Sequence, residues 1–367
     1  MRAYRSVTLY GTVSRVTDTS TPSSSMTMRN IKLLVPPVLP PDHLLAFERA
    51  GHCTVHGLAP QMQRNLPAID AAYASQQLAV HRQKLRVLLG DDALIKEERS
   101  AADEKSLLAA LRRRLSALPE GSAPFLQAFN LWRTSAEVAE LAASPALAGA
   151  AAALLGVDRV RLYQDSLFVK RPGDGQTHWH SDLAMSPLDT NSFVTCWLPL
   201  QSVPAETDGG SGLVFASGSH RDVALHYWHG DSSEATDCDD RGYAESEAAA
   251  LALGDATFHH GWTLHCASPN QLRKPRRALA FSYFADGATR LGKGAKRLPH
   301  SEDAESYAAW LRDVPPAAPA RHRLLPLVWD GAKGGAQRIA QLPAAERSSP
   351  KARARPARAR GKSKGRR

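Results

Sequence analysis

The sequence predicts a mainly β fold, a sandwich or jelly roll, with flanking helices packed against one of its sheets. Residues 61–155 carry apolar side chains at helical spacing, and from residue 160 onward the spacing changes to that of strands. Several short strands separated by turns rich in Gly, Pro and Asp are typical of sandwiches and jelly rolls. The helices precede the strands, so we expect N-terminal helices to buttress one sheet.

The helical part is expected over 61–156. Before it, 44–48 predicts a short helix and 51–57 a strand. Pro145 should divide the last helical stretch into two helices, because proline cannot continue a helix interior. Gly156 should end this region as a C-cap.

The β core is expected over 158–285. Its predicted strands are rich in β-branched and aromatic residues and are separated by turn residues. A short helix should follow within the next stretch, around 307–311. The predicted strands are 161–169, 192–200, 212–216, 256–266 and 278–285.

Both ends of the chain differ from the body, which we expect to be one domain over 31–330. Residues 1–30 are rich in Arg, Ser and Thr, and we expect a flexible extension there, either a transit segment or an extended start. Residues 331–367 hold twelve Lys or Arg and one acid, a net +11, against +10 for the whole chain. The body is therefore close to neutral, and we expect nucleic-acid contact only weakly, through a disordered basic tail.

The cysteines and the apolar runs bear on location. Four cysteines are scattered without a CxxC pair, which favours free thiols in a reducing compartment, cytoplasmic or organellar. No run approaches the roughly 18 apolar residues of a membrane helix. We therefore expect no membrane span.

The residues that carry chemistry begin with His180 and Asp182. In a strand, residues two apart share a face, so the imidazole and the carboxylate can converge. A third ligand must come from a distant strand, and His259, His260 and His265 are candidates. We choose His265, because an arginine stands eleven positions behind it. Two imidazoles and one carboxylate on one face of a metal are the non-haem Fe(II) oxygenase arrangement.

That arginine, Arg276, fits the co-substrate of such iron sites, which is a dicarboxylate. A planar guanidinium holds a carboxylate through two parallel hydrogen bonds, which lysine cannot reproduce. The alternative is a basic turn over 273–277 that faces water.

Several motifs in order resemble the phytanoyl-CoA dioxygenase-like family of Fe(II)/2-oxoglutarate-dependent oxygenases, over roughly residues 40–290. The resemblance implies a double-stranded β-helix (a cupin-like jelly roll) in which His180, Asp182 and His265 hold Fe(II). It also implies 2-oxoglutarate as co-substrate, with its far carboxylate on Arg276, and O2 as oxidant. The motifs are 168–173 (FVKRPG), 179–182 (WHSD), 197–200 (WLPL), 210–213 (GSGL), 217–220 (SGSH) and 265–270 (HCASPN).

One position departs from the family pattern. Members often place a serine two residues after the distal histidine to assist the co-substrate carboxylate, and here that residue is Ala267. Ser268 or Thr195 is expected to substitute. Related halogenating enzymes lack the metal-binding carboxylate, so Asp182 favours hydroxylation.

Three readings remain open from the sequence. The leading one is a hydroxylase that acts on an aliphatic C–H of a small or lipid-like molecule and decarboxylates 2-oxoglutarate to succinate. The second is a catalytically inactive cupin-like binding protein. The third is an enzyme that uses the same site with another metal.

Overall fold

A computed structural model describes residues 39–222, 242–292, 304–340 and 342. The expected extension at 1–30 and most of the expected basic tail, 343–367, lie outside the described residues.

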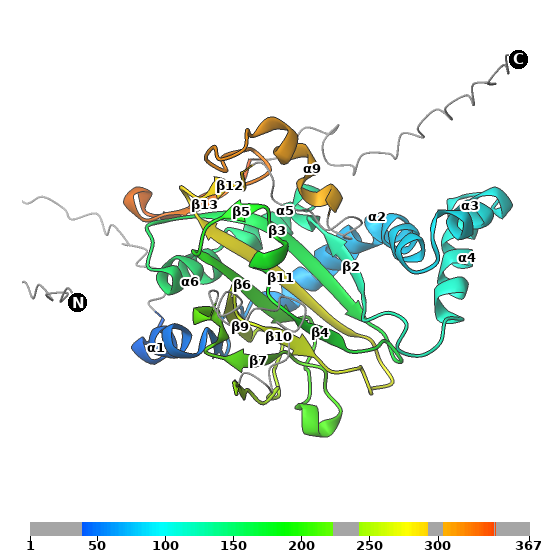
Figure 1. The fold of residues 1–367 in the computed structure, drawn as a ribbon, viewed down its shortest axis with the longest axis horizontal. Coiled ribbons are helices and arrows are strands. Elements are labelled where there is room, and N and C mark those ends of the chain that lie inside the picture. Colours follow the sequence, from blue (N-terminus) through cyan, green and yellow to red (C-terminus); the bar gives the residue numbers. More distant parts are fainter. Residues whose placement is uncertain (1–38, 223–241, 293–303, 341, 343–367) are drawn as a thin grey trace, which may run out of the picture. The chain divides into compact units, whose positions relative to one another are not determined.

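The described strands form a mainly β jelly roll built from antiparallel sheets (Figure 1). The larger sheet has eight strands, in the order β1-β9-β6-β11-β3-β13-β14 with β2 also paired to β3, and the smaller has the order β4-β10-β7-β8. A third sheet pairs β12 (Thr289–Arg290) with β5 (Leu188–Asp189). The larger sheet contains β1 (His52–Val55), β2 (Leu126–Phe129), β3 (Arg159–Lys170), β6 (Phe193–Pro199), β9 (Ala256–His260), β11 (Arg276–Ala285), β13 (Leu327–Asp330) and β14 (Gly335–Ala336), and the smaller contains β4 (Thr177–His180), β7 (Val214–Ser217), β8 (Ala244–Glu245) and β10 (His265–Ala267).

Helices cover one face of the larger sheet, as the helical pattern before the strands predicts. The main core lies between them, where alternate residues of β3, β6 and β11 are fully buried. The Tyr283 hydroxyl crosses this interface and donates to the carbonyl oxygen of Ala142 at 2.8 Å. The described helices are α1 (Pro41–Ala50), α2 (Met62–Leu89), α3 (Asp91–Ser100), α4 (Glu104–Ser116), α5 (Ala136–Ala142), α6 (Pro145–Leu155) and α9 (Ala304–Asp313).

The break at Pro145 and the end at Gly156 are confirmed. Ser144 caps α6 by accepting a hydrogen bond from the Leu147 N–H at 3.3 Å, and Pro145 occupies the first helical position, where no donor is needed. Gly156 takes the left-handed conformation (φ 63°) that favours glycine at a C-cap. Residues 136–155 are long and apolar enough to qualify as a candidate membrane span, but 61% of that window is buried inside the protein.

A buried carboxylate fixes the turn that joins β2 to α5. Asp165, on β3, is fully buried and accepts hydrogen bonds from the main-chain N–H groups of Leu131 (2.9 Å) and Trp132 (3.0 Å). Burial raises the pKa of Asp165 to about 6, despite these donors and the nearby Arg133.

The structure corrects two expectations. The strand predicted over 256–266 is two strands in different sheets, because the chain turns at 261–264 and the N–H of Thr263 bonds back to the His260 carbonyl at 2.8 Å. The domain also continues past residue 330. Residues 335–336 form β14 beside β13, and Leu342 is buried.

Candidate metal centre

Two histidines lie side by side on neighbouring strands of the smaller sheet. His180 ends β4 and is paired in register with His265, the first residue of β10, and their ring centroids lie 4.2 Å apart. Nδ1 of His180 is 2.8 Å from the carbonyl oxygen of His178, and Nδ1 of His265 is 3.0 Å from that of Thr263. Because a carbonyl only accepts, both Nδ1 atoms carry the proton, and both Nε2 lone pairs remain for a metal.

Asp182 reaches the histidines from a turn, which corrects the expectation that it shares a strand with His180. β4 stops at His180, and Asp182 has helical angles (φ −64°, ψ −39°) as the first residue of a turn that continues into Leu183–Met185. The N–H of Leu183 donates to the Gly261 carbonyl at 2.9 Å. This bond ties the turn to the loop before His265, so the carboxylate is brought in by tertiary contacts.

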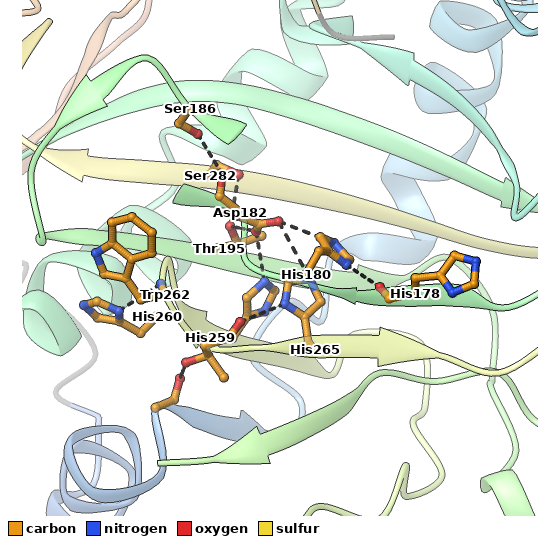
Figure 2. A network of polar contacts seen from close by, with 12 residues as sticks. His178, His180, Asp182, Ser186, Thr195, His259, His260, Trp262, His265 and Ser282 are labelled. Carbon is orange, nitrogen blue, oxygen red and sulfur yellow. Dashed lines mark hydrogen bonds and ion pairs between the residues drawn. The ribbon is translucent and has the colours of Figure 1, made fainter. Parts of the chain in front are cut away.

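The three side chains form one cluster (Figure 2). Their nearest donor atoms all lie within 4.8 Å of one another, and Oδ1 of Asp182 is 3.9 Å from Nε2 of His180 and 3.7 Å from Nε2 of His265. Metal–ligand bonds of about 2 Å place neighbouring donors roughly 3 to 4 Å apart. The donor set and its spacing therefore fit a two-histidine, one-carboxylate metal site.

The protonation states of the cluster suit a cation. Burial lowers the pKa of His265 well below its usual value, and the neighbouring His180 and His259 act in the same direction. Burial alone would raise the pKa of Asp182, but a hydrogen bond from His259 and the adjacent imidazoles lower it below its usual range. A neutral imidazole beside an ionised carboxylate is the form that binds metal.

The second oxygen of Asp182 is held from the larger sheet. Its Oδ2 accepts from the Thr195 hydroxyl at 2.6 Å and lies 3.0 Å from Nε2 of His259. This corrects the expectation that Thr195 assists the co-substrate carboxylate, because its hydroxyl bonds Asp182 at the metal cluster. His259, one of the candidate ligands, contacts the carboxylate of Asp182. Strand alternation carries the signal for His259, since it puts His259 and His260 on opposite faces of β9.

Arg276 lies buried at the start of β11, as the sequence predicts. Its side chain is over the ring of Trp197, 5.4 Å from the centroid, and only 4% of the residue is exposed. Among the described residues no carboxylate pairs with it, and its Nε has no hydrogen-bond partner. Burial lowers the pKa of Arg276 to about 10. A buried, unpaired guanidinium is costly, which indicates a site prepared for an anion.

A lysine of the 168–173 motif lies beside this arginine. Lys170 is paired in register with Arg276 and is fully buried. Its Nζ donates to the carbonyl oxygen of Ala267 at 3.2 Å. Burial and the adjacent guanidinium lower the pKa of Lys170 to about 7. Arg276 and Lys170 are therefore two buried basic residues paired on neighbouring strands. Lys170 also contacts Ala267, which is two residues beyond His265 on β10.

The neighbouring candidates are placed elsewhere. Arg277 is ion-paired with Asp70, and Arg273 is exposed. The hydroxyl of Ser268 donates to Glu206 and so is engaged away from Arg276. The basic-turn alternative therefore holds for Arg273 and not for Arg276.

Comparisons with known proteins agree with this site. The phytanoyl-CoA dioxygenase (PhyH) family matches residues 47–278. A probable α-ketoglutarate-dependent hypophosphite dioxygenase of Stutzerimonas stutzeri is 26% identical over 138 residues, which are 36% of this chain and 47% of that relative. The chain thus matches about half of that relative's length.

A solved structure with a TM-score above 0.5 shares the fold. The α-ketoglutarate-dependent carbocyclase SnoK from nogalamycin biosynthesis is 19% identical with a TM-score of 0.56, and the match covers 79% of this chain and 96% of that one. The structure of EctD from S. alaskensis with 2-oxoglutarate and 5-hydroxyectoine is 19% identical with a TM-score of 0.46, covering 79% and 92%. The sequence match spans the two metal-site strands, and the chain therefore belongs to the phytanoyl-CoA dioxygenase (PhyH) family, whose members are Fe(II)- and 2-oxoglutarate-dependent oxygenases.

Proposed function

We propose that this protein is an Fe(II)/2-oxoglutarate-dependent dioxygenase that hydroxylates an aliphatic C–H of a small or lipid-like molecule. The observation that carries the proposal is the pairing of two features. A two-histidine, one-carboxylate cluster is formed by the smaller sheet and the turn after β4, and a buried guanidinium without a carboxylate partner among the described residues lies on β11 of the larger sheet. A cupin-like binding protein needs neither a free Nε2 pair nor a buried cation without a partner.

His180, Asp182 and His265 would hold the metal through two imidazole nitrogens and one carboxylate oxygen. The bound Fe(II), together with 2-oxoglutarate and O2, would supply oxidation of a C–H coupled to decarboxylation of 2-oxoglutarate to succinate. Of the three side chains, His180 is 29% exposed and Asp182 22%, whereas His265 is 6% exposed. Substrate therefore approaches from the His180 and Asp182 side.

Arg276 and Lys170 would orient the co-substrate. The Ala267 carbonyl, which Lys170 contacts, is two residues beyond His265, or roughly 7 Å along β10 at the usual rise of a strand. A five-carbon dicarboxylate bridges such a gap, with one end at the metal cluster and the other at the cations. Ala278 and Ala280 occupy β11 between Arg276 and the metal end, and their small side chains pack against Trp197.

The reaction outcome rests on Asp182. Similar proteins include a dioxygenase and a carbocyclase, so the fold accommodates more than one outcome. A carboxylate on the metal fills the position that a halide would need, which favours hydroxylation. Among the described residues Cys53, Cys196 and Cys266 form no disulfide, which is in keeping with a reducing compartment, where iron stays ferrous.

The experiment is anaerobic titration of the purified chain with Fe(II) and then 2-oxoglutarate, followed by visible absorption. We expect a charge-transfer band of the chelate in the wild type and its loss in His265→Ala. His178→Ala is the matched control, because His178 lies on the same strand with an exposed side chain directed away from the cluster (Figure 2). Absence of the band in the wild type, with no iron retained, would refute the oxygenase proposal.

A further inference from the structure

His259 is buried against Asp182 and contacts the carboxylate oxygen that does not face His180 and His265. Oδ1 of Asp182 faces His180 and His265, whereas Oδ2 is 3.0 Å from Nε2 of His259 and 2.6 Å from the Thr195 hydroxyl. Figure 2 shows the carboxylate between these two groups of side chains. The two oxygens of Asp182 therefore have different surroundings.

The direction of the His259 hydrogen bond follows from its partners. An ionised carboxylate only accepts, so the proton of this contact lies on Nε2. The other ring nitrogen, Nδ1, is buried and has no hydrogen-bond partner among the described residues. His259 thus directs its donor at Oδ2 and engages no other described polar group.

The neighbours of His259 leave its ring little freedom. It is 1% exposed, and its ring centroid lies 4.3 Å from that of His265 and 5.5 Å from that of Phe215. Its strand partner on β6 is Thr195, so both donors project from the same face of the larger sheet. The Thr195 hydroxyl is also 3.0 Å from the Ser282 hydroxyl on β11. His259, Thr195 and Ser282 therefore form a hydrogen-bonded group on three strands of the larger sheet, β9, β6 and β11. This group holds the carboxylate of Asp182, which lies in the turn after β4 of the smaller sheet.

We propose that His259 is a positioning residue which, with Thr195, occupies Oδ2 of Asp182 and confines this carboxylate to binding metal through Oδ1 alone. This inference rests on the proposed function. Two imidazoles and one carboxylate oxygen would leave the remaining positions of a bound metal open for 2-oxoglutarate and O2. Binding through both Asp182 oxygens would take up one of those positions.

The test uses Co(II) as a spectroscopic substitute for Fe(II) and compares His259→Leu with His259→Gln in the full chain. Glutamine returns an N–H donor near the position of Nε2, whereas leucine fills space without one. We expect the Co(II) dissociation constant of His259→Leu to rise about 10- to 100-fold, the usual cost of losing a hydrogen-bond partner of a metal ligand. We also expect the Co(II) absorption spectrum to change, because a second carboxylate oxygen would replace a water ligand of the ion.

His259→Gln should restore both the Co(II) affinity and the absorption spectrum towards wild type. His260→Gln is the matched control, because His260 accepts a hydrogen bond from the Trp262 N–H and does not touch Asp182. Should His259→Leu fail to fold, Thr195→Val against Thr195→Ser tests the same oxygen from the other donor. The serine variant keeps the hydroxyl and is expected to resemble wild type.

The possible results separate the two proposals. A wild-type protein that takes up neither Co(II) nor Fe(II) refutes the proposed function. If the wild type binds metal and 2-oxoglutarate but His259→Leu has the same affinity and spectrum, the positioning role is wrong. The role is equally wrong if the glutamine and leucine variants are impaired alike, because the effect is then one of packing.

Discussion

Replacing Arg276 by methionine should weaken 2-oxoglutarate binding without unfolding the protein. The guanidinium lies over Trp197, is 4% exposed and has no carboxylate partner among the described residues. Its charge is therefore uncompensated until an anion binds. Methionine keeps most of the apolar length of the side chain and removes both the charge and the planar donor pair.

The size of the effect follows from the bonds that are lost. Hydrogen bonds between charged groups contribute about 1.5–3 kcal/mol each, and a guanidinium makes two to one carboxylate. Because such pairs are not additive, we expect a loss of about 3 kcal/mol, which raises the dissociation constant of 2-oxoglutarate roughly 150-fold. The free protein should be no less stable, since replacing an uncompensated buried charge by an apolar group is neutral or stabilising.

The assay is anaerobic titration of the Fe(II) protein with 2-oxoglutarate, with the thermal midpoint of the metal-free protein measured in parallel. Arg277→Met is the matched control, because the neighbouring Arg277 is ion-paired with Asp70 on the outside. Arg276→Lys keeps the charge but not the fork, and is expected to give an intermediate affinity. An unchanged dissociation constant in Arg276→Met would refute the assignment, as would a loss that Arg277→Met reproduces.

Three further predictions follow from other buried groups. The pKa of Lys170 is about 7, so the lysine loses its positive charge as the pH rises above about 7. The affinity for 2-oxoglutarate should then fall up to tenfold per pH unit. Titrations with 2-oxoglutarate at pH 7, 8 and 9 should show this fall in the wild type and not in Lys170→Met. Asp165→Leu leaves two buried main-chain N–H groups without an acceptor, so urea unfolding should show about 2–5 kcal/mol less stability, with a smaller loss in Asp165→Asn. In Gly210→Ala the new Cβ would lie 1.9 Å from the Pro204 carbonyl oxygen, so the thermal midpoint of this variant should fall sharply. Gly292 has open space around the position of a Cβ, so Gly292→Ala should match the wild type.

The sequence located much of the fold and the metal ligands through local signals. β-Branched and aromatic residues in 161–169 and 192–200 predicted β3 and β6, and Pro145 and Gly156 predicted a helix break and a helix end. His180, Asp182 and His265 were chosen for residue type and order, and the structure brings these three together. Periodicity and turn chemistry act over a few residues, so the sequence alone is sufficient for them.

The tertiary structure decided which groups complete the site. The contact between His259 and Asp182 joins residues 77 apart, and that between Lys170 and Ala267 joins residues 97 apart. Both contacts depend on how the two sheets face each other, and the first also depends on the turn after β4, which moves Asp182 out of the strand. Such contacts follow from the register of paired strands and the packing of sheets, and no local pattern encodes them. Residue type thus determined the metal chemistry, while topology decided the hydrogen bonds to Asp182 and the pairing of Lys170 with Arg276.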